Sequence, residues 1–132
     1  MDSNIKIVSA GIIEDQGKIL LARRQNSGSF GGKWEFPGGK QEPNENIEEC
    51  LIREIQEEFG VLVEPKEVIG ESIYKYDRGA LRLIGLRAII TSGNLELRVH
   101  DECAWVSPSD LHSYDLAPAD IPLADIIKDL YE

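Results

Sequence analysis

The segment from Asn46 to Gly60 constrains the fold of this chain most, because it has the pattern of an amphipathic helix with marked ends. Asn46 followed by Glu49 is a capping-box pattern, and Gly60 suits a residue that ends a helix in the left-handed conformation. Apolar residues recur at helical spacing, which places one stripe toward a core: Ile47, Leu51, Ile55 and Phe59. The pattern therefore predicts a helix from 46 to 59 with one buried face.

Segments with the composition of β-strands lie on both sides of this helix. Those before it are Ile5–Ile13, Lys18–Ala22 and the short run Trp34–Phe36, and those after it are Val61–Val63, Glu67–Tyr76, Leu81–Thr91, Leu95–Arg98 and Cys103–Val106. Pro37-Gly38-Gly39 is expected to interrupt regular structure, Ser107–Asp110 to form a helical turn, and Ile121–Tyr131 to form a C-terminal helix. The order predicts a layered α/β fold around a mixed sheet, with residues 1–132 as one domain.

The charge balance excludes several classes of function. Fourteen Lys and Arg residues against 24 Asp and Glu residues give a net charge of −10, so the chain is not expected to bind a nucleic acid polymer or an anionic membrane. We find neither a signal-peptide pattern nor an apolar run that could span a membrane, and two cysteines make no disulfide framework. These features predict a cytoplasmic protein. His100 and His112 are too scattered for a zinc site and are expected at the surface.

Three carboxylates on the predicted helix share one face, since Glu54, Glu57 and Glu58 stand at positions i, i+3 and i+4. Glu58 falls between Ile47 and Leu51 around the helix axis, so its carboxylate is partly withdrawn from water. Desolvation and repulsion would both raise its pKa, and a divalent cation such as Mg²⁺ or Mn²⁺ would relieve both effects. A solvated acidic face is the alternative, and the helix alone does not decide between them.

Neighbouring residues favour the metal site. Gly38 and Gly39 precede the helix, and a backbone without Cβ atoms can approach a metal or a phosphate closely. Arg53 can hold the adjacent acids in an ionic network. Arg23 and Arg24 end a predicted strand, where they could contact phosphate or remain solvated surface charges.

The residues from Gly39 to Val61, GKQEPNENIEECLIREIQEEFGV, resemble the Nudix box, G-x5-E-x7-R-E-U-x-E-E-x-G-U, in which U is aliphatic. All nine specified positions match: Gly39, Glu45, Arg53, Glu54, Ile55, Glu57, Glu58, Gly60 and Val61. The preceding stretch LLARRQNSGSFGGKWEFPGGK resembles MutT-like nucleoside triphosphate pyrophosphohydrolases. LAPADIPL, residues 116–123, is similar to the bacterial CTP pyrophosphohydrolase branch.

This resemblance implies a Nudix fold, with a mixed sheet sandwiched between helices (α/β/α), and hydrolysis of a nucleoside triphosphate to a monophosphate and pyrophosphate with Mg²⁺ or Mn²⁺. The resemblance implies five metal-site residues, namely Gly38 through its carbonyl, Glu54, Glu57, Glu58 and Glu102. Glu54 would also orient or deprotonate the attacking water, and Arg53 would hold the glutamates, so that Arg53, Glu54, Glu57 and Glu58 form the expected catalytic set.

The resemblance also implies the residues that bind the substrate. Arg24, and after it Arg23, would contact phosphate, while Gly39 would lie against the substrate and Glu35, Phe36 and Asp120 would line a base pocket. For Asp120, helix N-capping before Ile121-Pro122 is the alternative. The substrate could be a cytidine-type or an oxidised nucleotide, and the protein a monomer or a homodimer. Hydrolysis of another nucleoside diphosphate derivative, such as ADP-ribose or a dinucleoside polyphosphate, and nucleotide sensing without hydrolysis remain the competing hypotheses.

Overall fold

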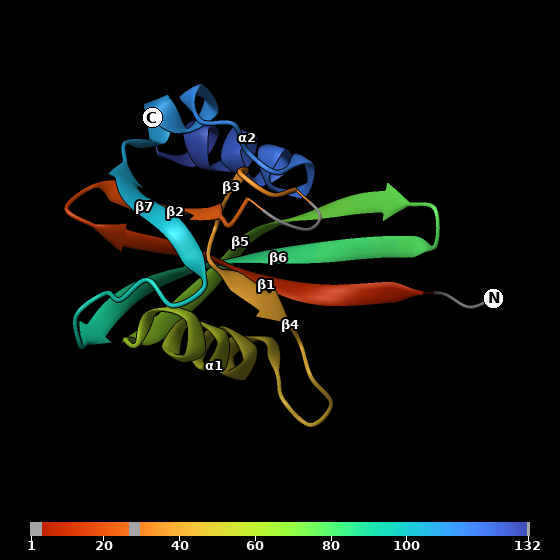
Figure 1. Cartoon of the computed structure of the whole chain (residues 1–132), viewed down its shortest axis with the longest axis horizontal. Helices are drawn as coiled ribbons and strands as arrows, with labels where there is room; N and C mark the ends of the chain where they lie inside the picture. The colour runs from red at the N-terminus through yellow and green to blue at the C-terminus, as the bar shows by residue number, and fades with distance from the viewer. Residues whose placement is uncertain (1–3, 27–29, 132) are drawn as a thin grey trace.

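The computed structural model describes residues 4–26 and 30–131, and its centre is a seven-stranded mixed sheet (Figure 1). The main path of strands is β3-β2-β1-β6-β5, with β4 paired to β1 and β7 paired to β2. β1 runs parallel to β6, and the other pairs are antiparallel. The strands are β1 (Ile5–Asp15), β2 (Lys18–Arg24), β3 (Trp34–Glu35), β4 (Gly38–Lys40), β5 (Leu62–Tyr76), β6 (Gly79–Ser92) and β7 (His100–Val106).

Two helices cover opposite sides of the sheet, α1 (Ile47–Phe59) and α2 (Ile121–Leu130) (Figure 1). Alternate side chains of β1 and β2 pack on the two sides of the sheet, because successive side chains of a strand point to opposite faces. Ile13 and Leu20 pack in the core cluster that contains the buried face of α1, whereas Ile12 and Ile19 pack in the cluster that contains α2. The predicted α/β/α arrangement is confirmed.

Two short 3₁₀ helices, η1 (Pro108–Ser113) and η2 (Pro118–Asp120), precede α2. The second of them runs directly into the first residue of α2. None of the helices that the structure describes has the length and apolar character needed to cross a membrane.

The ends of α1 follow its sequence pattern. The Asn46 side chain accepts a hydrogen bond from the Glu49 backbone N–H, and the Glu49 carboxylate accepts one from the Asn46 backbone N–H in return. Gly60 ends the helix with φ of 72°, a left-handed conformation that glycine adopts without the strain of a Cβ atom. The helix that carries the clustered carboxylates is therefore fixed at both ends by local sequence.

The structure corrects three details of the predicted elements. Gly38–Lys40 does not interrupt regular structure but forms β4, which pairs with β1. The two segments predicted at 61–63 and 67–76 form the single strand β5, in which Pro65 lies at an irregularity in the pairing with β6. Because proline cannot donate a ladder hydrogen bond, such irregularities are where a strand accommodates it.

The third correction concerns Leu95–Arg98, which is not a strand. Its backbone N–H groups at Glu96 and Arg98 donate to the carbonyl oxygens of Phe59 and Glu58, at 2.9 and 3.3 Å. The Arg98 guanidinium donates to a further carbonyl of the last helical turn. This segment therefore satisfies the Glu58 and Phe59 carbonyl groups at the end of α1, which have no partner inside the helix.

Candidate active site

A cavity of about 460 Å³ lies between α1, β4 and the segment leading into α2. Its size is within the range of small-molecule sites in proteins. The polar or glycine residues of its lining that the sequence analysis singled out are Arg24, Glu35, Gly38, Gly39, Glu58 and Asp120. The cavity therefore joins the end of the glycine-glycine motif and one helix carboxylate to the residues expected around a base.

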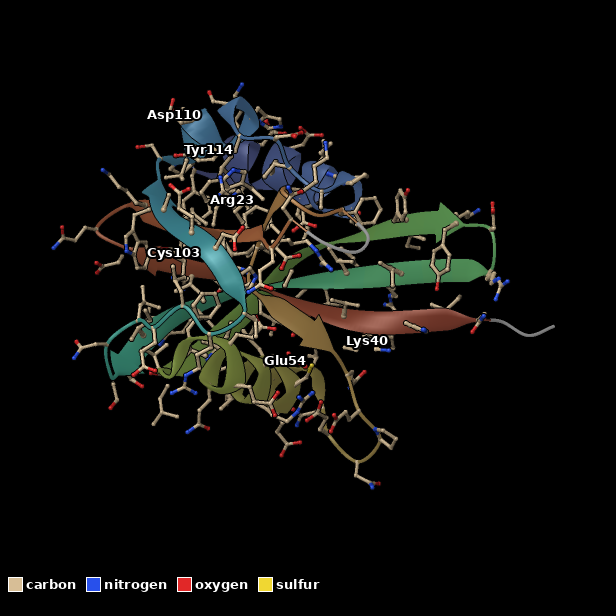
Figure 2. The ribbon with its side chains drawn as sticks, in the orientation of Figure 1. Arg23, Lys40, Glu54, Cys103, Asp110 and Tyr114 are labelled. Atoms are coloured by element: carbon tan, nitrogen blue, oxygen red, sulfur yellow. The ribbon has the colours of Figure 1, made fainter. Side chains whose placement is uncertain are left out.

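The glycine pair lies so close to its neighbours that side chains would not fit. A Cβ on Gly38 would overlap the backbone carbonyl of Ser9, and a Cβ on Gly39 would overlap the Glu54 carboxylate. The Ser9 hydroxyl accepts from the Gly39 N–H and donates to the Gly39 carbonyl, at 3.4 and 3.3 Å. Figure 2 shows Glu54 on α1 and Lys40 at the end of β4. The backbone of β4 is thus held directly against the acidic face of the helix.

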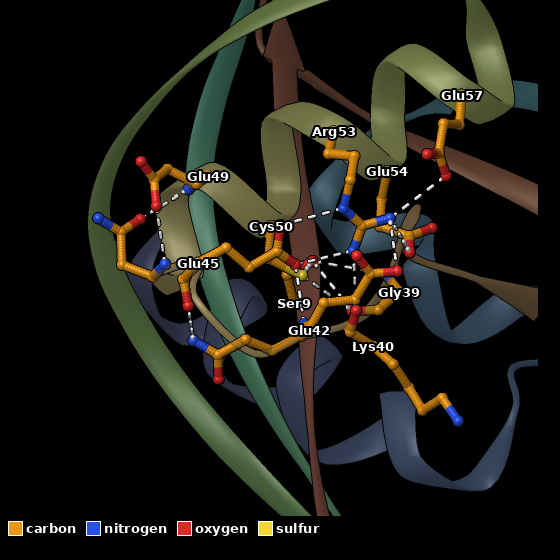
Figure 3. Close-up of polar contacts among 12 residues, drawn as sticks. Ser9, Gly39, Lys40, Glu42, Glu45, Glu49, Cys50, Arg53, Glu54 and Glu57 are labelled. Carbon is orange, nitrogen blue, oxygen red and sulfur yellow. Dashed lines mark hydrogen bonds and ion pairs between the residues drawn. The ribbon is translucent and has the colours of Figure 1, made fainter.

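Arg53 connects the acids of this face, as Figure 3 shows. Its Nε and Nη2 atoms donate to the two oxygens of Glu45, at 3.0 and 2.8 Å, and its Nη1 donates to Glu54 at 3.0 Å and to Glu57 at 3.3 Å. The Arg53 hydrogen bonds to Glu45, together with one from the Glu42 backbone N–H, lower the pKa of Glu45 to about 2. The planar guanidinium offers donors in several fixed directions, so one side chain orients three carboxylates. The ionic network predicted for Arg53 is present.

Of the three helix carboxylates Glu54, Glu57 and Glu58, it is Glu58 that lines the cavity. Burial raises its pKa well above the ordinary value, and the hydrogen-bond contact with the Glu54 side chain and the negative charges of Glu54, Glu35 and Glu57 raise it further. Within the described part of the chain its Oε1 atom is buried and has no hydrogen-bond partner. A buried carboxylate oxygen without a partner is energetically costly, so this atom is suited to a cation that supplies the missing interaction.

In the conformation observed, Glu54 and Glu57 are less available to a divalent cation than Glu58, because Arg53 donates hydrogen bonds to both. Glu57 is 61% exposed and is held by Arg53. Among residues 4–26 and 30–131, no three acidic, histidine or cysteine side chains already converge as a metal site. The donor set of carboxylates beside a glycine backbone nevertheless has the oxygen chemistry that Mg²⁺ and Mn²⁺ prefer, and the unpartnered Glu58 oxygen marks where such an ion fits.

Glu35 places a second carboxyl group on the cavity wall. Arg24 donates to its Oε1 at 3.0 Å, and His100 Nε2 lies 2.9 Å from its Oε2. His100 is the first residue of β7, is 4% exposed in its side chain, and stacks on the Phe59 ring with 5.2 Å between centroids. The expectation of a surface position for His100 is therefore wrong.

Asp120 also lines the cavity. Its Oδ2 atom accepts the Phe36 backbone N–H at 2.8 Å, and the side chain makes no N-capping hydrogen bond to α2. Asp120 is 5% exposed, and this burial raises its pKa to about 8 despite the Phe36 N–H and Arg24, which act in the opposite direction. Phe36 lines the same cavity, whereas Trp34 packs edge-on against Tyr114. The Asp120 side chain therefore lines the cavity and does not cap α2, and its contact with a base stays a prediction.

Arg23 and Glu102 form a pair outside this arrangement. They face each other across β2 and β7, and Arg23 Nη1 lies 3.4 Å from Glu102 Oε1. The Glu102 side chain is 55% exposed, and neither residue is part of the cavity lining described above. Arg24 therefore lines the cavity together with Glu58, whereas Arg23 and Glu102 do not.

Two titratable lining residues were missed by the sequence analysis, Lys40 and His100. Lys40 directly follows the glycine pair, so its proximity could have been inferred from that motif. His100 had no comparable signal, because its position depends on the pairing of β7 with β2 and on an irregularity beside Arg24.

A family model and several known proteins match almost the whole chain. The family model described as NUDIX domain matches residues 4–130. The chain is 41% identical over 122 residues to the CTP pyrophosphohydrolase of Escherichia coli K12, covering 89% of this chain and 87% of the relative. It is 33% identical over 129 residues to the putative 8-oxo-dGTP diphosphatase 2 of Mycobacterium tuberculosis H37Rv, covering 95% and 90%. The solution structure of the E. coli ORF135 protein superposes with a TM-score of 0.87 at 35% identity, covering 97% and 91%.

Proposed function

Because the chain belongs to the NUDIX family of hydrolases, we propose that it hydrolyses a nucleoside triphosphate to a nucleoside monophosphate and pyrophosphate. The observation that supports this most is that Glu58 and the glycine pair line the same cavity as Phe36 and Asp120. A polyphosphate can then lie against the carboxylate face of α1 while the base occupies the end formed by Asp120.

The residues proposed to hold a divalent cation, Mg²⁺ or Mn²⁺, are Glu57, Glu58 and the Gly38 carbonyl, with Glu54 at the edge of this set. When bound, such an ion neutralises phosphate charge and lowers the pKa of a coordinated water. Glu58 is suited to this role because its Oε1 is buried without a partner among the described residues. The proposal does not depend on Glu102, whose carboxylate is engaged by Arg23.

Glu54 is proposed to accept a proton from the attacking water, or to orient it. Water then forms a new bond to phosphorus as the anhydride bond between the α- and β-phosphates breaks, and the two products leave as a monophosphate and pyrophosphate. Arg53 donates to Glu54 and Glu57 and holds both in position. Arg24 lines the cavity and can offer further N–H groups to phosphate, since only its Nη1 is engaged by Glu35.

The base is proposed to pair with Asp120. With a pKa of about 8, this carboxyl carries its proton at neutral pH, so it can donate to a ring nitrogen and accept from an adjacent exocyclic amine. Cytosine presents that pair of groups. A cytidine-type triphosphate is therefore the first candidate, in agreement with the name of the E. coli relative. An oxidised purine nucleotide is the second, in agreement with the name of the M. tuberculosis relative.

Pyrophosphate release in the presence of Mg²⁺ or Mn²⁺ tests the proposal. The panel contains CTP, dCTP, 5-methyl- and 5-hydroxy-cytidine triphosphates, 8-oxo-dGTP, the ordinary triphosphates, ADP-ribose and a diadenosine polyphosphate. We expect a cytidine or oxidised-purine triphosphate to be hydrolysed best, with monophosphate and pyrophosphate as products. Hydrolysis of ADP-ribose or the dinucleotide alone would overturn the substrate class but keep the family chemistry, and binding without hydrolysis would indicate a sensor.

A further inference from the structure

We infer that His100 is a positioning residue that fixes the Glu35 carboxylate in the cavity, so that Glu35 can accept a hydrogen bond from an exocyclic amine of the base. This inference rests on the proposed function, because it assigns a role within the base pocket. His100 itself is not proposed to touch the reacting atoms.

Glu35 is held by one donor at each oxygen, and the two donors differ in rigidity. Arg24 holds Oε1 from a long side chain that is 42% exposed. His100 holds Oε2 from a ring that is 4% exposed and lies nearly parallel to the Phe59 ring, with 12° between the planes. A buried, stacked ring cannot follow a moving carboxylate, whereas an exposed arginine can. The orientation of Glu35 is therefore set by His100.

Electrostatic repulsion makes this donor necessary. Glu35 shares the cavity with Glu58 and Asp120, and its charge contributes to the raised pKa of both. Without a fixed donor on Oε2, Glu35 would relieve the repulsion by turning toward Arg24 and away from Glu58 and Asp120. With the donor in place, each Glu35 oxygen keeps a second lone pair that can accept an N–H group.

The ring nitrogens of His100 indicate which of them donates. Nδ1 is buried and has no hydrogen-bond partner among the described residues. An unpartnered N–H at Nδ1 would add the cost of a buried donor, and a carboxylate can only accept. The hydrogen-bond network therefore assigns the hydrogen to Nε2, the atom beside Glu35.

Two substitutions separate this role from simple packing. His100→Phe keeps an aromatic ring to stack on Phe59 but removes the donor, whereas His100→Gln removes the ring and keeps an N–H group of similar reach. His112→Phe is the matched control, because His112 Nε2 also pairs with a carboxylate, that of Asp125, but lies outside the cavity lining. Each variant is assayed with the triphosphate that the wild type hydrolyses best and with its analogue lacking the exocyclic amine.

We expect His100→Phe to raise KM for the amine-bearing substrate about tenfold, the scale of one hydrogen bond to a charged group, with a much smaller change in kcat. The amine-lacking analogue should be little affected, His100→Gln should show a smaller loss than His100→Phe because it keeps a donor without the rigid ring, and His112→Phe should match the wild type. In a Glu35→Gln background, His100→Phe should have no further effect on KM. Equal losses for both substrates, or losses that add to those of Glu35→Gln, would overturn the inference and leave His100 a packing residue.

A readout that needs no activity distinguishes failure of this inference from failure of the proposed function. Long-range ¹H–¹⁵N spectra of the wild type and Glu35→Gln report which ring nitrogen of His100 carries the hydrogen. We expect the hydrogen on Nε2, with a signal that shifts in Glu35→Gln. A hydrogen on Nδ1 alone would overturn the inference even in an active enzyme. Where the spectra agree with expectation but no triphosphate is hydrolysed, the proposed function fails and Glu35 positioning by His100 remains supported as a property of the site.

Discussion

The Glu54 carboxylate fills the space in which a Cβ atom of Gly39 would stand. Glu54 is held there from the other side by Arg53, whose Nη1 donates to its Oε2. The carboxylate proposed to receive the proton of the attacking water is thus confined between a glycine backbone and a guanidinium. Gly39 and Glu54 are fifteen residues apart in the Nudix box, and this contact gives a physical reason why glycine is required at the first of the two positions.

Gly39→Ala should reduce kcat strongly, because the methyl group displaces Glu54. We expect a loss of about 100-fold, comparable to moving a catalytic group by about 1 Å. Gly17→Ala is the control: Gly17 has φ of +79° and no atom near its Cβ position, so alanine should cost about 1 kcal/mol of stability through the backbone alone. Steady-state kinetics and urea unfolding check both variants. A Gly39→Ala enzyme with wild-type kcat would show that Glu54 does not act from this position.

Glu57→Gln should abolish turnover while the free energy of unfolding stays nearly unchanged. The Glu57 side chain is 61% exposed, so its ion pair with Arg53 contributes little to stability, whereas the loss of a negative oxygen weakens the proposed metal site. Glu48→Gln, at an exposed acid in the first turn of the same helix, should retain full activity. Hydrolysis is measured with increasing Mg²⁺. Wild-type turnover by Glu57→Gln at saturating Mg²⁺ would remove Glu57 from the ligand set.

Arg53→Lys should lower kcat at least about tenfold although the charge is conserved. An ammonium group cannot donate in the fixed directions that Arg53 uses toward Glu45, Glu54 and Glu57. The matched control is Arg82→Lys, which changes a two-pronged arginine contact with Glu71 on the exposed part of the sheet. Kinetic assays should show no effect of the control substitution. If both variants are fully active, a positive charge alone suffices at position 53.

The features predicted correctly are those that local sequence determines. Both ends of α1 follow from Asn46 and Gly60, and the face that carries Glu58 follows from helical periodicity. β1, β2 and β6 also lie where their composition places them, extended by a few residues at their ends. In each case the deciding interactions lie within a few residues of one another along the chain.

The features predicted wrongly depend on contacts between distant segments. Leu95–Arg98 has the apolar–polar alternation of a strand, but its backbone N–H groups donate to carbonyl groups at the end of α1. His100 appears as an isolated polar residue in the sequence, and its burial follows from the Phe59 ring and from Glu35, which is 65 residues away. The role of Glu102 as a metal ligand stays a prediction, and its place opposite Arg23 follows from the pairing of β7 with β2. No local pattern contains this information.

Asp120→Asn should make the stability of the protein less dependent on pH. The pKa of Asp120 is raised by burial, and also by Glu35, from 3.8 to about 8, whereas the unfolded chain keeps the lower value. Between these values the folded state binds more protons than the unfolded state, so the free energy of unfolding falls as pH rises through this window and levels off above about pH 8. Asparagine can still accept the Phe36 N–H but cannot ionise. The free energy of unfolding of Asp120→Asn should therefore fall by a few kcal/mol less between about pH 5 and pH 9 than that of the wild type.

Urea unfolding in metal-free buffer at several pH values measures this difference. Comparing the variant with the wild type isolates Asp120, because Glu58, whose pKa is also raised, is present in both proteins. Asp110→Asn, at an exposed carboxylate on η1, should follow the wild-type curve. Parallel curves for Asp120→Asn and the wild type would mean that Asp120 is already ionised at neutral pH. The base pocket would then offer only an acceptor at this position, and an amino group of the base would be its partner without a contribution from the ring nitrogen.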